Sequence, residues 1–364
     1  MMKVLYIGYY KENSDWGRYA TNNILALEKA GFDVVCRAIS FSGNETPREI
    51  SHLEDKSLDD CDVCIQHVFP EHLVGTDKFK KNIAIFGNEF VTLDHSSWAE
   101  QLNQLDQIWV ASEVAKDSMP KEIKDKTVVV PHCFDKSLYT KNYREIQVPE
   151  LTGKFKFYTV VDAYDNQTET ILRCFHSEFD KDDNVALILQ LVGRETQESL
   201  DIKKHELKKK ISNQEDLSDC LLDMVVQRGQ DPESIYQLHQ YGDCFVTPSS
   251  QRCLPSSVFD AMCLGSVPVV LEGTDAAEYA DEAVVKSVYR TIERSDSMWK
   301  DVYNAKNFVF TPCEMGMRQT MRQLYNDWLK DPMIHVERRK QGLEKAEKFS
   351  QESFGNTVKE VLNA

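Results

Sequence analysis

Short runs of β-branched residues alternate with amphipathic helical patterns along most of this chain, and this alternation constrains the fold more than any other feature. Lys3–Gly8 (KVLYIG) predicts a strand, Tyr19–Ala30 a helix and Asp33–Ala38 a second strand. Four more strands are predicted, at Val63–Val68, Ile83–Phe86, Gln107–Ala111 and Thr127–Val130. Strands that alternate with helices favour a parallel sheet covered by helices on both faces.

The pattern pauses in a polar stretch, residues 136–153, and then begins again. The second series of predicted strands comprises Phe155–Val161, Asn184–Val192, Leu221–Val226, Asp243–Thr247 and Val267–Leu271. A chain of 364 residues has room for two domains. We therefore expect an α/β protein of two Rossmann-like, doubly wound parallel-sheet domains. Ligands of such proteins usually bind in the cleft where the carboxyl ends of the strands meet.

Charge and hydropathy exclude several functions. The chain has 59 acidic and 43 basic residues, a net charge of −16, which disfavours nonspecific binding to nucleic acid or anionic lipid. No apolar stretch approaches the length of a membrane span, and the N-terminus has no signal-peptide core. The ten cysteines are scattered, many within apolar runs, as expected for buried free thiols. We expect a cytoplasmic protein.

Four segments together resemble glycosyltransferases of the GT-B fold, specifically the retaining enzymes of family 4. Gln107–Ser112 (QIWVAS) and Val128–Asp135 (VVVPHCFD) are similar to the passage that closes the first domain of that family. Asp243–Gly265 (DCFVTPSSQRCLPSSVFDAMCLG) is similar to its signature segment, and Lys340–Ala364 to its closing helix. The order and spacing match over nearly the whole chain.

The resemblance implies that one domain binds the acceptor and the other binds the donor. Residues 1–140, with a C-terminal helix at 345–364 that crosses back, would form the acceptor domain. Residues 154–340 would bind a nucleotide sugar, UDP- or GDP-linked. The family transfers the sugar with retention of configuration, and the leaving phosphate helps to remove the acceptor proton. The resemblance implies neither a metal ion nor a cofactor, and the sequence contains no Asp-x-Asp motif.

The signature segment supplies the expected donor site. Ser256 and Ser257 precede an apolar helix, whose free N–H groups and positive dipole end suit a diphosphate. Asp260 stands where the family has a ribose-binding glutamate. Arg252 stands in place of the family's other glutamate, and the family's phosphate-binding Arg and Lys are missing. Arg252, with Arg194, would supply the missing positive charge; alternatively, Arg252 is a solvated loop residue.

Three candidates lie in the first half of the chain. Gly17 matches the family's glycine turn near the donor, although a glycine there also suits an ordinary turn. Glu89 follows a predicted strand and faces the cleft, as a catalytic carboxylate or as a capping or salt-bridging one. His67 ends another strand and either orients a sugar or is structural. His132 is expected to be structural, and His239 to lie on the surface.

Three functions remain open from the sequence. The first is a retaining glycosyltransferase with an unidentified acceptor, either a glycan or a small molecule. The second is a transferase that modifies hydroxymethylated pyrimidines in DNA, for which a basic cleft rim would be the sign. The third is a degenerate protein that binds a nucleotide sugar or a glycan without turnover. A dinucleotide-dependent dehydrogenase is disfavoured because no Gly-x-Gly-x-x-Gly follows the first strand.

Overall fold

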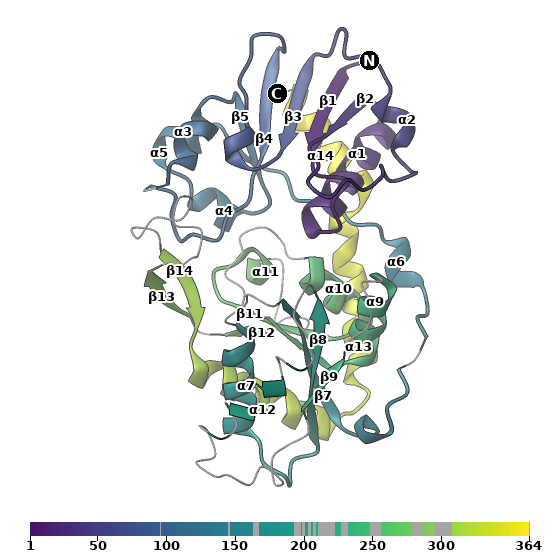
Figure 1. The fold of residues 1–364 in the computed structure, drawn as a ribbon, viewed down its shortest axis with the longest axis vertical. Coiled ribbons are helices and arrows are strands. Elements are labelled where there is room, and N and C mark those ends of the chain that lie inside the picture. Colours follow the sequence, from purple (N-terminus) through teal and green to yellow (C-terminus); the bar gives the residue numbers. More distant parts are fainter. Residues whose placement is uncertain are drawn as a thin grey trace.

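A computed structural model shows the arrangement of these elements in space. It describes residues 1–94, 96–144, 146–162, 167–192, 198, 201–202, 205–206, 209, 223–226, 232–247, 256–278, 286–288, 290–294 and 308–363. Figure 1 shows two lobes, each built around its own sheet, with the C-terminal helices running alongside the second lobe and back to the first. The expected two-sheet α/β architecture is confirmed.

The sheet of the first lobe has six parallel strands in the order β2-β1-β3-β4-β5-β6. These strands are β1 (Lys3–Gly8), β2 (Asp33–Ala38), β3 (Val63–His67), β4 (Lys81–Ile85), β5 (Gln107–Val110) and β6 (Thr127–Val129). Every residue of β3 is buried, as expected for a strand packed on both faces. All six carboxyl ends lie at the same edge of the sheet, because the strands are parallel.

The sheet of the second lobe also has six parallel strands, in the order β12-β11-β10-β7-β8-β9. These strands are β7 (Phe155–Asp162), β8 (Val185–Val192), β9 (Asp223–Val226), β10 (Cys244–Val246), β11 (Val267–Leu271) and β12 (Lys286–Val288). The sequence predicts five of them. It misses β12, because the three residues KSV are too few to show the alternation of apolar and polar residues that is typical of a strand.

Helices cover the sheets and connect the two lobes. They are α1 (Asp15–Lys29), α2 (Ser51–Glu54), α3 (Trp98–Asn103), α4 (Glu113–Asp117), α5 (Lys121–Lys124), α6 (Ser137–Thr140), α7 (Gln167–Glu178), α9 (Pro232–Tyr241), α10 (Ser256–Leu264), α11 (Asp275–Glu278), α12 (Glu314–Lys330), α13 (Ile334–Ala346) and α14 (Gln351–Asn363), with single 3-10 turns η1 (Pro70–His72), η2 (Pro149–Leu151) and η3 (Glu347–Phe349). Helix α13 packs on α10 of the second lobe, and α14 packs on α1 of the first. Gly355 permits this return, since a Cβ there would lie 2.6 Å from the Cβ of Ala30.

A hairpin forms a second connection between the lobes. Strands β13 (Arg290–Arg294) and β14 (Phe308–Pro312) pair antiparallel, and the sequence does not predict them. The backbone N–H of Val91, after β4, donates to the carbonyl of Phe308 at 2.8 Å. Phe90 and Val309 form an isolated bridge beside this hydrogen bond. The loop after β4 is therefore held from both lobes.

The sequence prediction is wrong about the start of α1 and about the burial of His239. Helix α1 begins at Asp15 rather than Tyr19, because Ser14 caps it: the Ser14 hydroxyl accepts a hydrogen bond from the N–H of Gly17 at 3.3 Å. His239 is fully buried rather than on the surface, with its Nδ1 2.8 Å from the hydroxyl of Tyr158. Its charged and polar neighbours in sequence do not reveal that partner, which lies on β7.

The described ranges contain no helix that has both the length and the apolarity needed to cross a membrane. Of the cysteines in these ranges, Cys313 is half-buried and the others are buried, and all are free thiols.

Candidate functional site

The N-terminus of α10, the expected phosphate-binding position, faces the start of α1. The backbone N–H of Ser256 donates to a carboxylate oxygen of Asp15 at 3.2 Å, and the Ser256 hydroxyl donates to the other oxygen. A carboxylate is favoured at a helix N-terminus by the free N–H groups and the dipole. Burial raises the pKa of Asp15, with a contribution from nearby Asp260, although Ser256 and Arg18 oppose it. An anion of the chain itself thus stands where an external anion was expected.

Asp260 is bound by a guanidinium from the opposite lobe. Arg18 donates to both carboxylate oxygens, at 2.6 and 2.7 Å, in a bidentate fork. The side chain of Asp260 is 3% exposed and that of Arg18 is 20% exposed. Burial lowers the pKa of Arg18, but the Asp260 carboxylate outweighs it and holds that pKa well above its ordinary value. This buried ion pair joins α1 to α10.

Aromatic side chains complete the surroundings of the ion pair. The hydroxyl of Tyr139 donates to Asp260 at 2.7 Å and accepts from Arg18 at 3.0 Å. The guanidinium lies 5.8 Å from the ring centre of Phe134 and 5.5 Å from that of Tyr236. Asp260 therefore already accepts three hydrogen bonds from protein groups, and a carboxylate has about four acceptor positions. Only one acceptor position is left, so two ribose hydroxyls can bind Asp260 only if at least one of these protein donors moves away.

Gly17 lies in the first turn of α1, and its place in the structure explains why it is a glycine. A Cβ at this position would lie 2.0 Å from the carbonyl oxygen of Glu12, because the chain between β1 and α1 folds back tightly. No side chain fits there. The glycine brings the start of α1, with Asp15 and Arg18, against the second lobe.

His67 ends β3 inside a buried polar cluster. The side-chain amide of Asn23 donates to the Tyr6 hydroxyl at 3.4 Å, and that hydroxyl lies 2.9 Å from Nδ1 of His67. Tyr6 is fully buried. Within the part of the chain that the structure describes, its hydrogen finds its acceptor at Nδ1. We therefore assign the proton of neutral His67 to Nε2, which makes that nitrogen a hydrogen-bond donor.

A second imidazole stacks beside His67. The ring centres of His67 and His132 are 5.3 Å apart, and the ring of Tyr19 stacks on His132 at 4.2 Å. Burial lowers the pKa of His67 well below its ordinary value, and His132 adds to the effect. Burial alone lowers the pKa of His132 to about 4. Both imidazoles are neutral at pH 7 and are weak proton acceptors.

Glu89 lies half-buried on the loop that β14 holds. The side chain of Asn88 fixes this loop, since its oxygen accepts from the N–H of Phe90 at 2.8 Å and its amide donates to Ser118 at 3.3 Å. Across the described ranges, the Glu89 carboxylate has no hydrogen-bond partner. The backbone around Glu89 is thus fixed while its carboxylate stays available.

The remaining candidates are placed only in part. Ser257 is the second residue of α10 and is half-buried. Arg252 and Arg194 lie outside the described residues, so the expected role of each stays a prediction. In the described ranges no group of three His, Cys, Asp or Glu side chains is arranged to hold a metal ion.

The groups that contact the predicted donor site are not among the residues that the sequence motifs predict. Asp15, Arg18 and Tyr139 all converge on α10, but the family motifs include none of them. One signal was present in the segment DWGRY: opposite charges three residues apart lie in one helical turn that follows a strand of a parallel sheet. Charged side chains in this position lie at the carboxyl edge of the sheet, where ligands usually bind.

Comparison with known proteins identifies the fold. No family model and no curated protein matches this sequence. A glycosyltransferase structure from Rickettsia africae matches 99% of this chain and 97% of its own, with a TM-score of 0.63 and 9% identity. Anabaena HepE in complex with UDP-glucose matches all of both chains (TM-score 0.62, 12% identity). Sucrose-phosphate synthase from Thermosynechococcus elongatus matches all of this chain and 98% of its own (TM-score 0.63, 12% identity). The chain therefore has the GT-B fold, as the sequence predicts.

Proposed function

We propose that this chain is a glycosyltransferase that moves a sugar from a nucleotide-sugar donor to an acceptor hydroxyl with retention of configuration. One observation carries the proposal: the GT-B fold brings the N-terminus of α10 and Asp260 to the junction with α1, where the resemblance places the donor. A similar structure, Anabaena HepE, is a complex with UDP-glucose. That complex favours a UDP-linked donor over a GDP-linked one.

Donor binding would exchange the partners at this junction. The ribose hydroxyls would take the acceptor positions of Asp260, and the diphosphate would replace Asp15 at Ser256. The Arg18 guanidinium, freed from Asp260, would then pair with the phosphate oxygens, to which its fork is suited. Arg18 would thus supply positive charge to the diphosphate, in addition to the charge that the sequence predicts from Arg252 and Arg194. These groups would neutralise the leaving diphosphate without a metal ion.

The protein groups near the acceptor would position rather than react. Retention by front-face attack uses the leaving phosphate as the base, so no protein base is required. Neutral His67 would donate a hydrogen bond from Nε2 to a sugar hydroxyl, a role that its lowered pKa suits. Glu89 would accept a hydrogen bond from the acceptor.

The first experiment is isothermal titration with UDP, GDP, ADP and dTDP and with their glucose conjugates. We expect saturable binding of UDP and UDP-glucose that is unchanged by EDTA. Asp260→Asn should weaken UDP binding at least about tenfold, since it removes the charge that accepts the ribose hydroxyls. Asp183→Asn is the matched control, because Asp183 makes a comparable bidentate pair with Arg322, at 2.6 and 3.0 Å, away from the junction.

Transfer is tested separately, by NMR of the anomeric proton during incubation with UDP-glucose and a panel of glycosides. An α-linked product from the α-linked donor would support retention, whereas a β-linked product would refute it. Failure of a cooperatively folded protein to bind any nucleotide would refute the donor function and favour the non-catalytic alternative. Oligonucleotides that contain hydroxymethylcytosine belong in the panel as acceptors; the net charge of −16 leads us to expect no product from them.

A further inference from the structure

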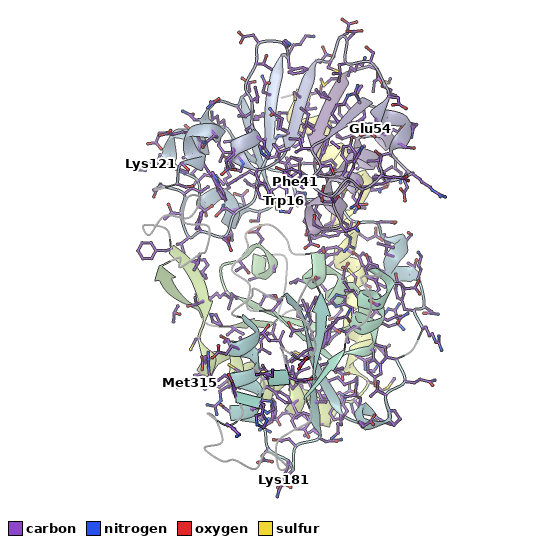
Figure 2. The ribbon with its side chains drawn as sticks, viewed as in Figure 1. Trp16, Phe41, Glu54, Lys121, Lys181 and Met315 are labelled. Atoms are coloured by element: carbon purple, nitrogen blue, oxygen red, sulfur yellow. The ribbon has the colours of Figure 1, made fainter. Side chains whose placement is uncertain are left out.

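Three aromatic side chains surround Tyr9 where β1, β2 and β3 end. The ring of Tyr9 lies 6.0 Å from that of Trp16, 5.4 Å from that of Phe41 and 5.3 Å from that of Phe69. Tyr9 is buried, but Phe41 is 67% exposed and Phe69 is 43% exposed. We call Trp16, Phe41 and Phe69 the aromatic platform. Figure 2 shows Trp16 and Phe41 close together at the edge of the first lobe that faces the second.

The loop that carries Phe41 is held in place by hydrogen bonds. The Glu12 carboxylate accepts from the backbone N–H of Phe41 at 2.8 Å, from the Ser40 hydroxyl at 2.9 Å and from the N–H of Ser42 at 3.3 Å. Three bonds to one carboxylate order an otherwise exposed loop. The backbone of Phe41 is thus held by the Glu12 carboxylate, while its ring is exposed to solvent.

Phe69 is fixed in a similar way. Its backbone N–H donates to the Tyr9 hydroxyl at 2.9 Å, and that hydroxyl lies 2.9 Å from Nδ1 of His72. Exposed rings that are already ordered lose little further freedom when they bind a partner. Exposed apolar rings that gather in one place are typical of a binding surface.

The platform is continuous with the junction where the donor is proposed to bind. The ring of Trp16 lies 4.8 Å from that of His67. Trp16 also follows Asp15, whose carboxylate contacts Ser256 at the N-terminus of α10. A molecule that rests on the platform therefore lies beside the residues that contact the proposed donor site.

We propose that the aromatic platform binds the acceptor, and that the acceptor is a neutral carbohydrate. One face of a pyranose ring presents C–H groups that pack on aromatic faces, while its hydroxyls point outward to polar groups. The rim supplies such groups in Ser40, Ser42 and Asn44, all exposed. This inference rests on the proposed function, because it names the acceptor of that transfer.

The charges around the platform disfavour a phosphorylated acceptor. Glu12 and Glu71 lie near the exposed rings, whereas Lys11 pairs with Glu54 at 2.9 Å and Arg18 pairs with Asp260 or, in the proposed donor complex, with the diphosphate. A phosphate brought to this surface would meet carboxylates first. The same charges disfavour DNA.

Saturation-transfer NMR on the full chain tests the proposal, with and without saturating UDP. The probes are the methyl glycosides of glucose, galactose, mannose and N-acetylglucosamine, together with glucose 6-phosphate. We expect saturation of the C–H protons on one face of at least one neutral glycoside, and weaker saturation of glucose 6-phosphate. Phe41→Ala combined with Phe69→Ala should weaken this binding about tenfold or more.

Met315→Ala is the matched control, since Met315 is 68% exposed and lies on α12 of the second lobe, far from the platform (Figure 2). It should bind the glycoside as the wild type does. The proposal is overturned if no neutral glycoside is saturated, if glucose 6-phosphate binds more tightly than methyl glucoside, or if the double variant binds unchanged. UDP titration of the same samples separates the two claims: retained UDP binding without glycoside binding refutes only the acceptor assignment, and the reverse refutes only the donor function.

Discussion

Arg18→Ala should destabilise the protein more than the replacement of any other exposed or half-buried residue of α1 by alanine. The change removes both hydrogen bonds of the fork, at 2.6 and 2.7 Å, and leaves a carboxylate that is only 3% exposed without its counter-charge. Removal of one partner from a buried ion pair costs about 3–5 kcal/mol. The Tyr139 hydroxyl still donates to Asp260 at 2.7 Å, so we expect the lower end of that range.

A double-mutant cycle isolates the contribution of the pair. Asp260→Ala alone leaves a guanidinium that is 20% exposed and rests on two aromatic rings, so its cost should be smaller, about 2 kcal/mol. The double variant removes both charges and should be no less stable than Arg18→Ala, giving a coupling energy of about 2–3 kcal/mol. Urea unfolding, followed by fluorescence and circular dichroism, measures all four proteins at pH 7.

One result would refute this reasoning. If Arg18→Ala costs less than about 1 kcal/mol and the two substitutions are additive, the pair is screened by solvent as a surface ion pair is. The two lobes would then not be joined at α1 and α10 in solution, and Asp260 would be open to a ribose without any exchange of partners.

Three further changes give distinct expected results. Gly17→Ala should destabilise by about 1–3 kcal/mol in urea unfolding, because its Cβ would meet a carbonyl oxygen at 2.0 Å; a neutral effect would contradict the tight turn. Asp15→Asn should tighten UDP binding about fivefold by removing a competing anion from α10, and weaker binding would show that this carboxylate assists the donor. Burial lowers the pKa of both His132 and His239 from 6.5 to about 4, so the unfolded chain binds protons first as the pH falls. Stability should therefore drop between pH 6.5 and 4, by about 2 kcal/mol per histidine at pH 5. His239→Gln should reduce this slope and exposed His205→Gln should leave it unchanged; equal slopes in all three proteins would contradict the assignment.

The elements were largely predictable because they depend on neighbours in the sequence. The run NVALILQLV predicts a buried strand, and the structure places β8 at Val185–Val192. The helix predicted to follow Ser256 and Ser257 is α10, which begins two residues earlier than expected, at Ser256 itself. The start of α1 was misplaced because its cap, Ser14, is followed by Asp15, Trp16 and Gly17, a turn without helical periodicity. The β13–β14 hairpin was missed because its support comes partly from the loop after β4.

The sequence by itself determined the α/β class, the two series of parallel strands, and a donor-like segment that ends in a helix with Asp260. These features follow from the periodic spacing of apolar residues within each element and from motifs that span about twenty residues. Only the tertiary structure decided what Asp260 contacts, since Arg18 lies 242 positions away and no local pattern relates the two. The same holds for the aromatic platform, whose rings follow three different strands, and for buried His239, whose partner lies on β7. Such contacts are set by the packing of whole elements, and a sequence pattern describes one element at a time.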